Sequence, residues 1–162
     1  GLSAATAVIL GNELGAGKIK RAEKYATQFF ILQFIVTIAS AFVVIGIRGP
    51  LIGLYNITEA VGRDVNICIL IFACYMPAKM FNYVNVVGVL RSGGDTKMCL
   101  FLDTSGVWCI GVPLAFLGAL VWHLPIYVVY GLVMLEEVYK AVLGYIRYRQ
   151  KKWLRNLTVQ VR

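Results

Sequence analysis

Five ionisable side chains lie inside long apolar stretches of this sequence, where a charge is costly unless it is paired or hydrated. They are Lys79, Asp103, Glu136, Glu137 and Lys140. A carboxylate in such a place can bind and release a proton or a cation, and a neighbouring lysine can change partners when that carboxylate is protonated. Ion pairs that only hold helices together are the structural alternative, and the sequence leaves both open.

The spacing of these residues predicts which of them meet. Glu136 and Lys140 are four residues apart, in the order that favours an ion pair on a helix. Glu137 points about 100° away from Glu136, so Lys79 is expected to be its partner. At about 1.5 Å per residue, Lys79 lies at the depth of the two glutamates and Asp103 at the depth of Lys140. Glu137 is the first candidate for a titrating group.

Further polar residues share the expected helix of Lys79. Tyr75, Asn82 and Asn85 fall with Lys79 within about 120° of arc, at about 100° per residue. Pro77 interrupts this stretch and frees a backbone carbonyl, which a membrane helix tolerates where it faces protein or a water-filled cavity. The sequence therefore predicts a substrate or ion cavity. Its expected residues are Tyr75, Lys79, Asn82, Asp103, Glu136, Glu137 and Lys140.

Apolar stretches must position these side chains. They cover residues 2–14, 25–47, 65–90, 98–122 and 126–146, and the last four each reach the roughly 20 residues that a spanning helix needs. The chain is 59% hydrophobic and only 15% charged, with a mean hydropathy of +0.74, whereas a soluble domain is about a quarter charged. The expected fold is an all-α polytopic membrane protein with one truncated and four full transmembrane helices.

Basic residues gather in alternate connections between the stretches. Twelve of the 16 lysines and arginines lie in the first connection, the third connection and the segment 147–162. By the positive-inside rule this side is cytoplasmic, so we expect a transmembrane part over 1–146 and a basic cytoplasmic tail over 147–162. The net charge of +8 is then explained by basic residues that lie near lipid headgroups. The expected partner is therefore the bilayer rather than nucleic acid.

The sequence offers little for enzyme or metal chemistry. It has one histidine, no nucleophile elbow, and four cysteines of which none has the two-residue spacing of a zinc or redox motif. The glycines near residue 15 do not form a phosphate loop, because Asn12 and Ile19 replace its glycine and hydroxyl residue. Gly11 and Gly15 have the spacing of close helix packing instead. We therefore expect no enzyme, no metal and no cofactor.

Two segments carry a family resemblance. The first stretch ends in GNELGAG, and the connection over 89–97 reads VLRSGGDTK. Their wording and order resemble the helix and loop motifs of the multidrug and toxic compound extrusion family. The similarity continues through Asp103, Trp108, Pro113, Glu136, Glu137, Lys140 and the tail to Leu157, which resemble one bacterial branch. The motif residues are Gly11, Gly15, Gly17, Arg91, Gly93, Gly94 and Asp95.

The resemblance implies twelve helices in two lobes, with this chain running from the end of helix eight through helix twelve. Gly1 in place of an initiating methionine agrees with a chain that continues upstream. Such proteins are bacterial inner-membrane antiporters that exchange protons or sodium ions for small amphipathic compounds. The implied partners are the N-terminal lobe of the same polypeptide and that substrate. Several members place a coupling carboxylate on the tenth helix, where this sequence has Lys79.

Two other functions remain open from the sequence. A lipid-linked oligosaccharide flippase of the same superfamily also has a cationic cavity, and lysines near the midplane suit a pyrophosphate. A structural membrane subunit that transports nothing is the third possibility. It would use the charged residues only as ion pairs between helices.

Overall fold

The computed structural model describes residues 1–155, and these form helices joined by short connections. The first hairpin contains α1 (Leu2–Gly15) and α2 (Ile19–Gly53). The third long rod is α3 (Glu59–Asn82), which the π-helix η1 (Tyr83–Leu90) continues. The fourth rod is a single run of α4 (Thr96–Gly106), η2 (Val107–Gly111), α5 (Val112–Phe116) and η3 (Leu117–Val121). The last is α6 (Ile126–Arg149).

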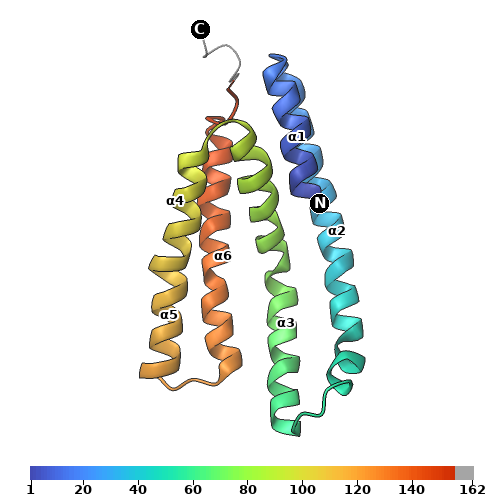
Figure 1. The fold of residues 1–162 in the computed structure, drawn as a ribbon, viewed down its shortest axis with the longest axis vertical. Helices are drawn as coiled ribbons and strands as arrows, with labels where there is room; N and C mark the ends of the chain where they lie inside the picture. The colour runs from blue at the N-terminus through green and yellow to red at the C-terminus, as the bar shows by residue number, and fades with distance from the viewer. Residues whose placement is uncertain (156–162) are drawn as a thin grey trace.

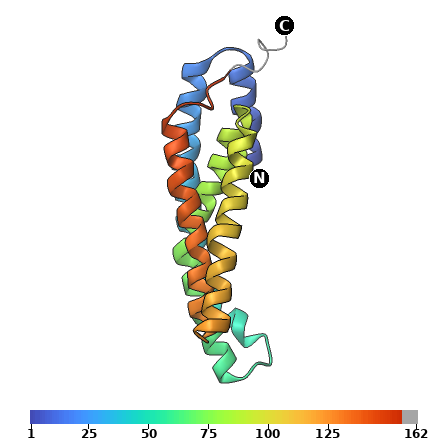
Figure 2. The same ribbon diagram turned by 90° about the vertical axis from the view of Figure 1, so that its left-hand side faces the viewer.

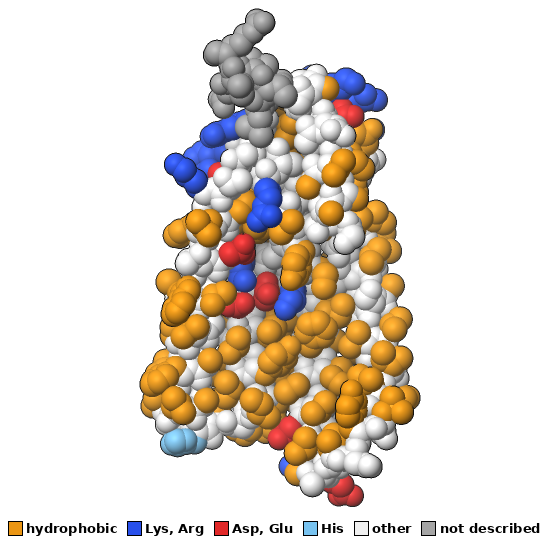
Figure 3. Space-filling view, viewed as in Figure 1, with side chains coloured by type: hydrophobic (Ala, Val, Ile, Leu, Met, Phe, Trp, Pro, Cys, Tyr) orange, Lys and Arg blue, Asp and Glu red, His pale blue; other side chains and the backbone are white. Residues whose placement is uncertain are grey.

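Three of these rods are long and apolar enough to cross a membrane: Ile19–Gly53, Glu59–Leu90 and Thr96–Val121. Their outer faces expose large apolar side chains, and hydrophobic side chains are spread over the length of the surface seen in Figure 3. The predicted all-α membrane fold is therefore confirmed. The expected fourth full span, α6, has 24 residues but is not among these three, because Glu136, Glu137 and Lys140 lie together near its middle.

The rods alternate in direction, so their connections fall at two ends (Figures 1 and 2). The α1–α2 connection, the η1–α4 connection and the end of α6 share one end, and the remaining two connections share the other. The first end is the one that collects the basic residues, and we call it the basic end. Residues 156–162 of the expected tail, with Arg162, lie outside the described residues.

The helix containing Pro77 departs from α-geometry later than expected. α3 continues through Pro77 to Asn82, and the π-helix begins only at Tyr83. A π-helical turn inserts extra backbone into a helix and is found frequently at functional sites. Here it lies directly after Lys79 and Asn82, two residues of the predicted cavity.

The best-packed part of the molecule lies toward the basic end. Leu10, Leu14, Leu90, Leu102 and Trp153 are at most 1% exposed there. Helices α1 and η1 approach each other closely at Gly88, where a Cβ would lie 2.9 Å from the Cγ2 of Thr6. The sequence did not single out this glycine. The predicted packing role of Gly11 is wrong within the described chain, since a Cβ there would meet nothing within 4 Å.

Candidate functional site

A cavity of about 240 Å³ opens between α3, η1, α4 and α6. Figure 3 shows acidic and basic side chains gathered on this face, within otherwise apolar surface. Charge is thus concentrated at one place along the apolar rods, and we call this place the charged cavity. Its lining residues are Lys79, Asn82, Tyr83, Val86, Val87, Asp103, Glu137 and Lys140.

Glu137 is the carboxylate that the charged cavity holds most firmly. It is 7% exposed, and the Asn82 Nδ2 group donates hydrogen bonds of 2.8 Å to its Oε2 and to its backbone oxygen. Lys79 Nζ lies 3.9 Å from Glu137 Oε1, the partner that the depth match predicts. Because of this long separation, Glu137 is held less tightly by Lys79 than by Asn82. The Lys79 side chain also keeps 28% of its surface exposed.

The second ion pair is packed against the backbone of the fourth rod. Lys140 Nζ donates to Glu136 Oε1 over 3.4 Å, in the predicted four-residue arrangement. A Cβ at Gly106 would lie 2.8 Å from Lys140 Cε, and one at Gly111 would lie 2.5 Å from Glu136 Oε2. The π-helix η2 begins directly after Gly106 and ends at Gly111. The two glycines therefore make room for the Glu136–Lys140 pair.

Gly106→Ala is expected to displace Lys140 and weaken this ion pair. The added methyl group would overlap three carbons of the lysine stem, at 2.8 to 3.1 Å, and overpacking of this kind costs about 1–3 kcal/mol. The apparent melting temperature of the full-length protein in detergent should fall relative to that of Gly46→Ala, whose Cβ meets nothing within 4 Å among residues 1–155. Equal melting temperatures for the two variants would show that Lys140 yields without cost.

Asp103 differs from the two glutamates because no ion pair engages it within the described residues. It is exposed, and it lines the same cavity as Lys140 and Glu137. The Oδ1 atom of Asn82, in the same cavity, is buried and accepts no hydrogen bond from residues 1–155. The cavity thus presents one free carboxylate and one free amide oxygen beside its paired charges.

The structure brings most of the predicted cavity residues together but not all of them. Tyr75 does not line the charged cavity, because the cavity extends from Lys79 toward the basic end and Tyr75 lies one turn in the other direction. Glu136 does not line it either and contacts it only through Lys140. Tyr83, Val86 and Val87, which the sequence analysis missed, follow Lys79 at helical spacing.

Asn85 also departs from the expected arrangement. It is 0% exposed and lies against α6, where a Cβ at Gly144 would be 2.7 Å from its Nδ2. Neither amide atom of Asn85 has a hydrogen-bond partner in the described part of the chain. Asn85 therefore does not line the charged cavity, although the sequence placed it on the same arc of the helix as Lys79.

The motif residues of the third connection meet the end of α6. Arg147 donates from Nη2 to Asp95 Oδ1 over 2.9 Å and from Nε to Asp95 Oδ2 over 2.5 Å. These hydrogen bonds raise the pKa of Arg147 above its ordinary value. A Cβ at Gly93 would lie 1.8 Å from the carbonyl oxygen of Trp153. Gly94 turns the chain with φ 76°, a conformation that favours glycine.

The remaining motif residues lie at the ends of α1 and η1 and in the α1–α2 connection. Gly17 turns the α1–α2 connection with φ 72°, and Arg91 is exposed at the end of η1. Gly15 ends α1. Among residues 1–155, no group of three or more histidines, cysteines, aspartates or glutamates is arranged to hold a metal ion.

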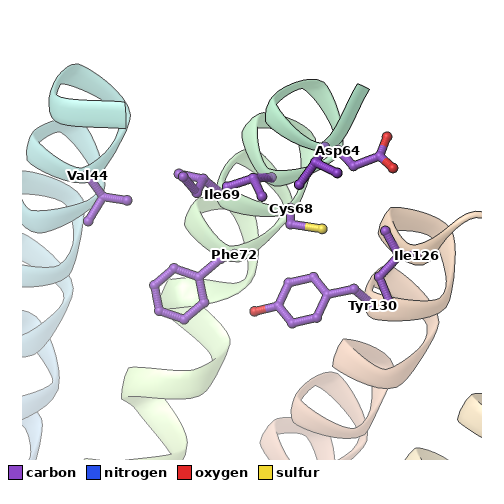
Figure 4. A pocket seen from close by; sticks show the side chains of 9 residues that line it. Val44, Asp64, Cys68, Ile69, Phe72, Ile126 and Tyr130 are labelled. Carbon is purple, nitrogen blue, oxygen red and sulfur yellow. The ribbon is translucent and has the colours of Figure 1, made fainter. Parts of the chain in front are cut away.

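A larger cavity of about 490 Å³ lies between α2, α3 and α6 (Figure 4). Its walls are apolar except for Asp64, Cys68 and Tyr130, so we call it the apolar cavity. Phe72, one of its lining residues, has its ring centroid 5.9 Å from Lys79 Nζ of the charged cavity. The two cavities have no lining residue in common, and the contact between Phe72 and Lys79 lies between them. The lining residues are Val44, Val61, Asp64, Val65, Cys68, Ile69, Phe72, Ile126 and Tyr130.

Comparison with known proteins identifies the family. The family model described as MatE matches residues 1–117, which is most of the chain. The chain belongs to the MatE family. This confirms the resemblance carried by the motifs at Gly11–Gly17 and Arg91–Asp95 and agrees with the membrane fold.

Curated MatE relatives align with nearly all or most of the chain. The chain is 21% identical to the uncharacterized transporter YisQ of Bacillus subtilis over 94% of its length, covering 33% of that protein. It is 25% identical to multidrug and toxin extrusion protein 1 of Homo sapiens over 90% of the chain and 26% of that protein. With the multidrug resistance protein MdtK of Yersinia pestis it shares 28% over 72% of the chain.

The chain spans only about a quarter to a third of the length of these relatives, because 33% of YisQ and 26% of the human protein are covered. No solved structure matches the chain significantly. Its membership of the MatE family and its apolar helices make it part of a multi-pass membrane protein.

Proposed function

We propose that the full-length protein is an ion-coupled antiporter that exports small amphipathic compounds, and that this chain supplies most of its C-terminal lobe. The observation that carries the proposal is an apolar cavity and a charged cavity on the same helix α3, with Phe72 of the first in contact with Lys79 of the second. A compound with one apolar and one polar end matches such a surface. The printed names of relatives such as multidrug and toxin extrusion protein 1 support the same class of function.

The charged cavity suggests how an ion could be coupled to this movement. A proton or sodium ion bound at Glu137 neutralises the carboxylate and removes the attraction that holds Lys79. Lys79 then gains freedom to turn toward Asp103, which lines the same cavity without an ion pair among residues 1–155. Such an exchange of partners favours one of two lobe arrangements. The second body is the N-terminal lobe of the same polypeptide, in a bacterial inner membrane with the basic end in the cytoplasm.

The proposal is tested with proteoliposomes that contain the full-length protein. We expect a fluorescent amphipathic cation to accumulate when a proton gradient or a sodium gradient is imposed, and the effective gradient identifies the coupling ion. Liposomes without protein and liposomes with dissipated gradients are the controls. Absence of dye movement under both gradients would refute the antiporter.

A flippase for lipid-linked oligosaccharides is the second candidate, and one observation favours it. Lys79 and Lys140 both line the charged cavity and offer two cationic donors for a pyrophosphate. In the same liposomes, movement of a lipid-linked sugar without dye movement would support this function. If neither compound moves, the remaining hypothesis is a structural membrane subunit that transports nothing.

A further inference from the structure

A third cavity, of about 430 Å³, lies at the basic end and belongs to neither of the cavities described above. It is lined by Glu23 of α2, by Tyr148 and Arg149 of α6, and by Lys151 and Trp153 beyond α6. The N-terminal turn of α2 and the end of α6 are remote in the sequence and are brought together here. We call this cavity the basic-end cavity.

Its polar groups are mainly hydrogen-bond donors. Arg149 and Lys151 are exposed cations, and the indole nitrogen of the buried Trp153 has no acceptor within residues 1–155. Glu23 is the one acid of the lining, and Lys151 already binds it over 2.6 Å. Arg149 also donates to the Tyr145 hydroxyl over 3.3 Å. Because two cations line the cavity against one acid, the cavity suits an anion. Lys20 and Lys24 flank Glu23 on α2 but do not line the cavity.

Aromatic rings connect this cavity to the apolar helix surfaces below it. Trp153 stacks on Tyr148 at 5.7 Å, Tyr148 meets Phe30 edge-on at 5.1 Å, and Phe30 stacks on Phe81 at 5.0 Å. Tyr145 lies beside Phe81 at 6.5 Å and is 48% exposed. Tyrosine and tryptophan beside basic residues are typical of the level where a membrane protein meets lipid headgroups.

We propose that the basic-end cavity binds the phosphate of an anionic phospholipid from the adjoining leaflet. The phosphodiester lies between Arg149 and Lys151, and an acyl chain lies along the aromatic row toward Phe81. The two cations of the lining favour an anionic headgroup over a zwitterionic one. A free phosphate ion would use the same donors but not the aromatic row, so the two sources can be separated by experiment.

The test uses the full-length protein in detergent and counts bound lipids by native mass spectrometry. We expect phosphatidylglycerol to bind several-fold more tightly than phosphatidylcholine, and the double variant Arg149→Gln, Lys151→Gln to lose about tenfold of that affinity. The matched control is Lys20→Gln, Lys24→Gln, which removes the same charge from residues that do not line the cavity and should change affinity less than twofold. Arg149→Lys should keep the preference for phosphatidylglycerol.

Several results would overturn the proposal. Equal binding of the two lipids would show that the cavity does not select an anionic headgroup. Equal losses in the two double variants would indicate diffuse attraction rather than a site. Displacement of phosphatidylglycerol by millimolar inorganic phosphate would identify a free anion as the ligand. Both double variants should keep the melting temperature of the unmodified protein, because exposed ion pairs such as Glu23–Lys151 contribute little to stability.

Discussion

Glu137→Gln is expected to reduce ion-driven transport by the full-length protein at least about tenfold while the protein still folds and inserts. Glutamine keeps the size of the side chain and can still accept the 2.8 Å hydrogen bond from Asn82. It cannot bind a proton or a cation with a negative charge, so Lys79 loses the partner whose charge would change during transport. The measurement is the initial rate of gradient-driven dye uptake into proteoliposomes at equal protein content.

The matched control is Glu136→Gln. This residue is adjacent to Glu137 and equally part of an ion pair, but it binds Lys140 and does not line the charged cavity. It should retain most of the transport rate. If Glu137→Gln transports with unchanged ion dependence, the charged residues only hold helices together. If both variants lose transport equally, damage to ion pairs in general accounts for the loss.

Gly93→Ala should strongly destabilise the basic end of the protein. A Cβ at this position would lie 1.8 Å from the carbonyl oxygen and 2.8 Å from the Cα of Trp153, so backbone rather than a flexible side chain must move. That movement would pull Trp153, now 1% exposed, out of its packing beside Tyr148. Loss of a buried aromatic side chain costs about 3–5 kcal/mol. The apparent melting temperature in detergent should fall by several degrees, with a lower yield of monodisperse protein.

Gly11→Ala is the control for this substitution because it adds the same methyl group to another motif glycine. Position 11 is inside α1, and a Cβ there meets nothing within 4 Å in the described part of the chain, so alanine should be neutral or slightly stabilising. Equal melting temperatures for Gly93→Ala and Gly11→Ala would show that the segment ending at Trp153 does not contribute to stability.

The length of the apolar runs predicted the fold class, and helical spacing and depth predicted the two ion pairs. Runs of about 20 apolar residues leave a helix as the main way to satisfy the backbone in a membrane, and helical depth placed Lys79 beside Glu137. The cavity wall was only partly predicted. Tyr83, Val86 and Val87 continue the helical face of Lys79, but an apolar residue facing a cavity has the same pattern as one facing lipid.

Other features depend on contacts that have no local signal. Asn85 of the π-helix η1 lies against Gly144 of α6, and neither the π-helix nor this contact could be predicted from the sequence. Trp153 belongs to a segment that reads as a basic tail, yet it is buried against Gly93. Its position depends on packing between segments that are remote in the chain, and periodicity carries no information about such pairs.

The contact between the third connection and the end of α6 also has a consequence for biosynthesis. Asp95 and Arg147 are 52 positions apart, so a ribosome adding about 5–20 residues per second completes the connection seconds before its partner emerges. During that interval the Asp95 carboxylate cannot yet pair with Arg147, and Gly93 cannot yet pack against the backbone of Trp153. A chain that stops within α6 before Arg147 would keep both groups without their partners. Fusion tags are accordingly best attached beyond Arg155.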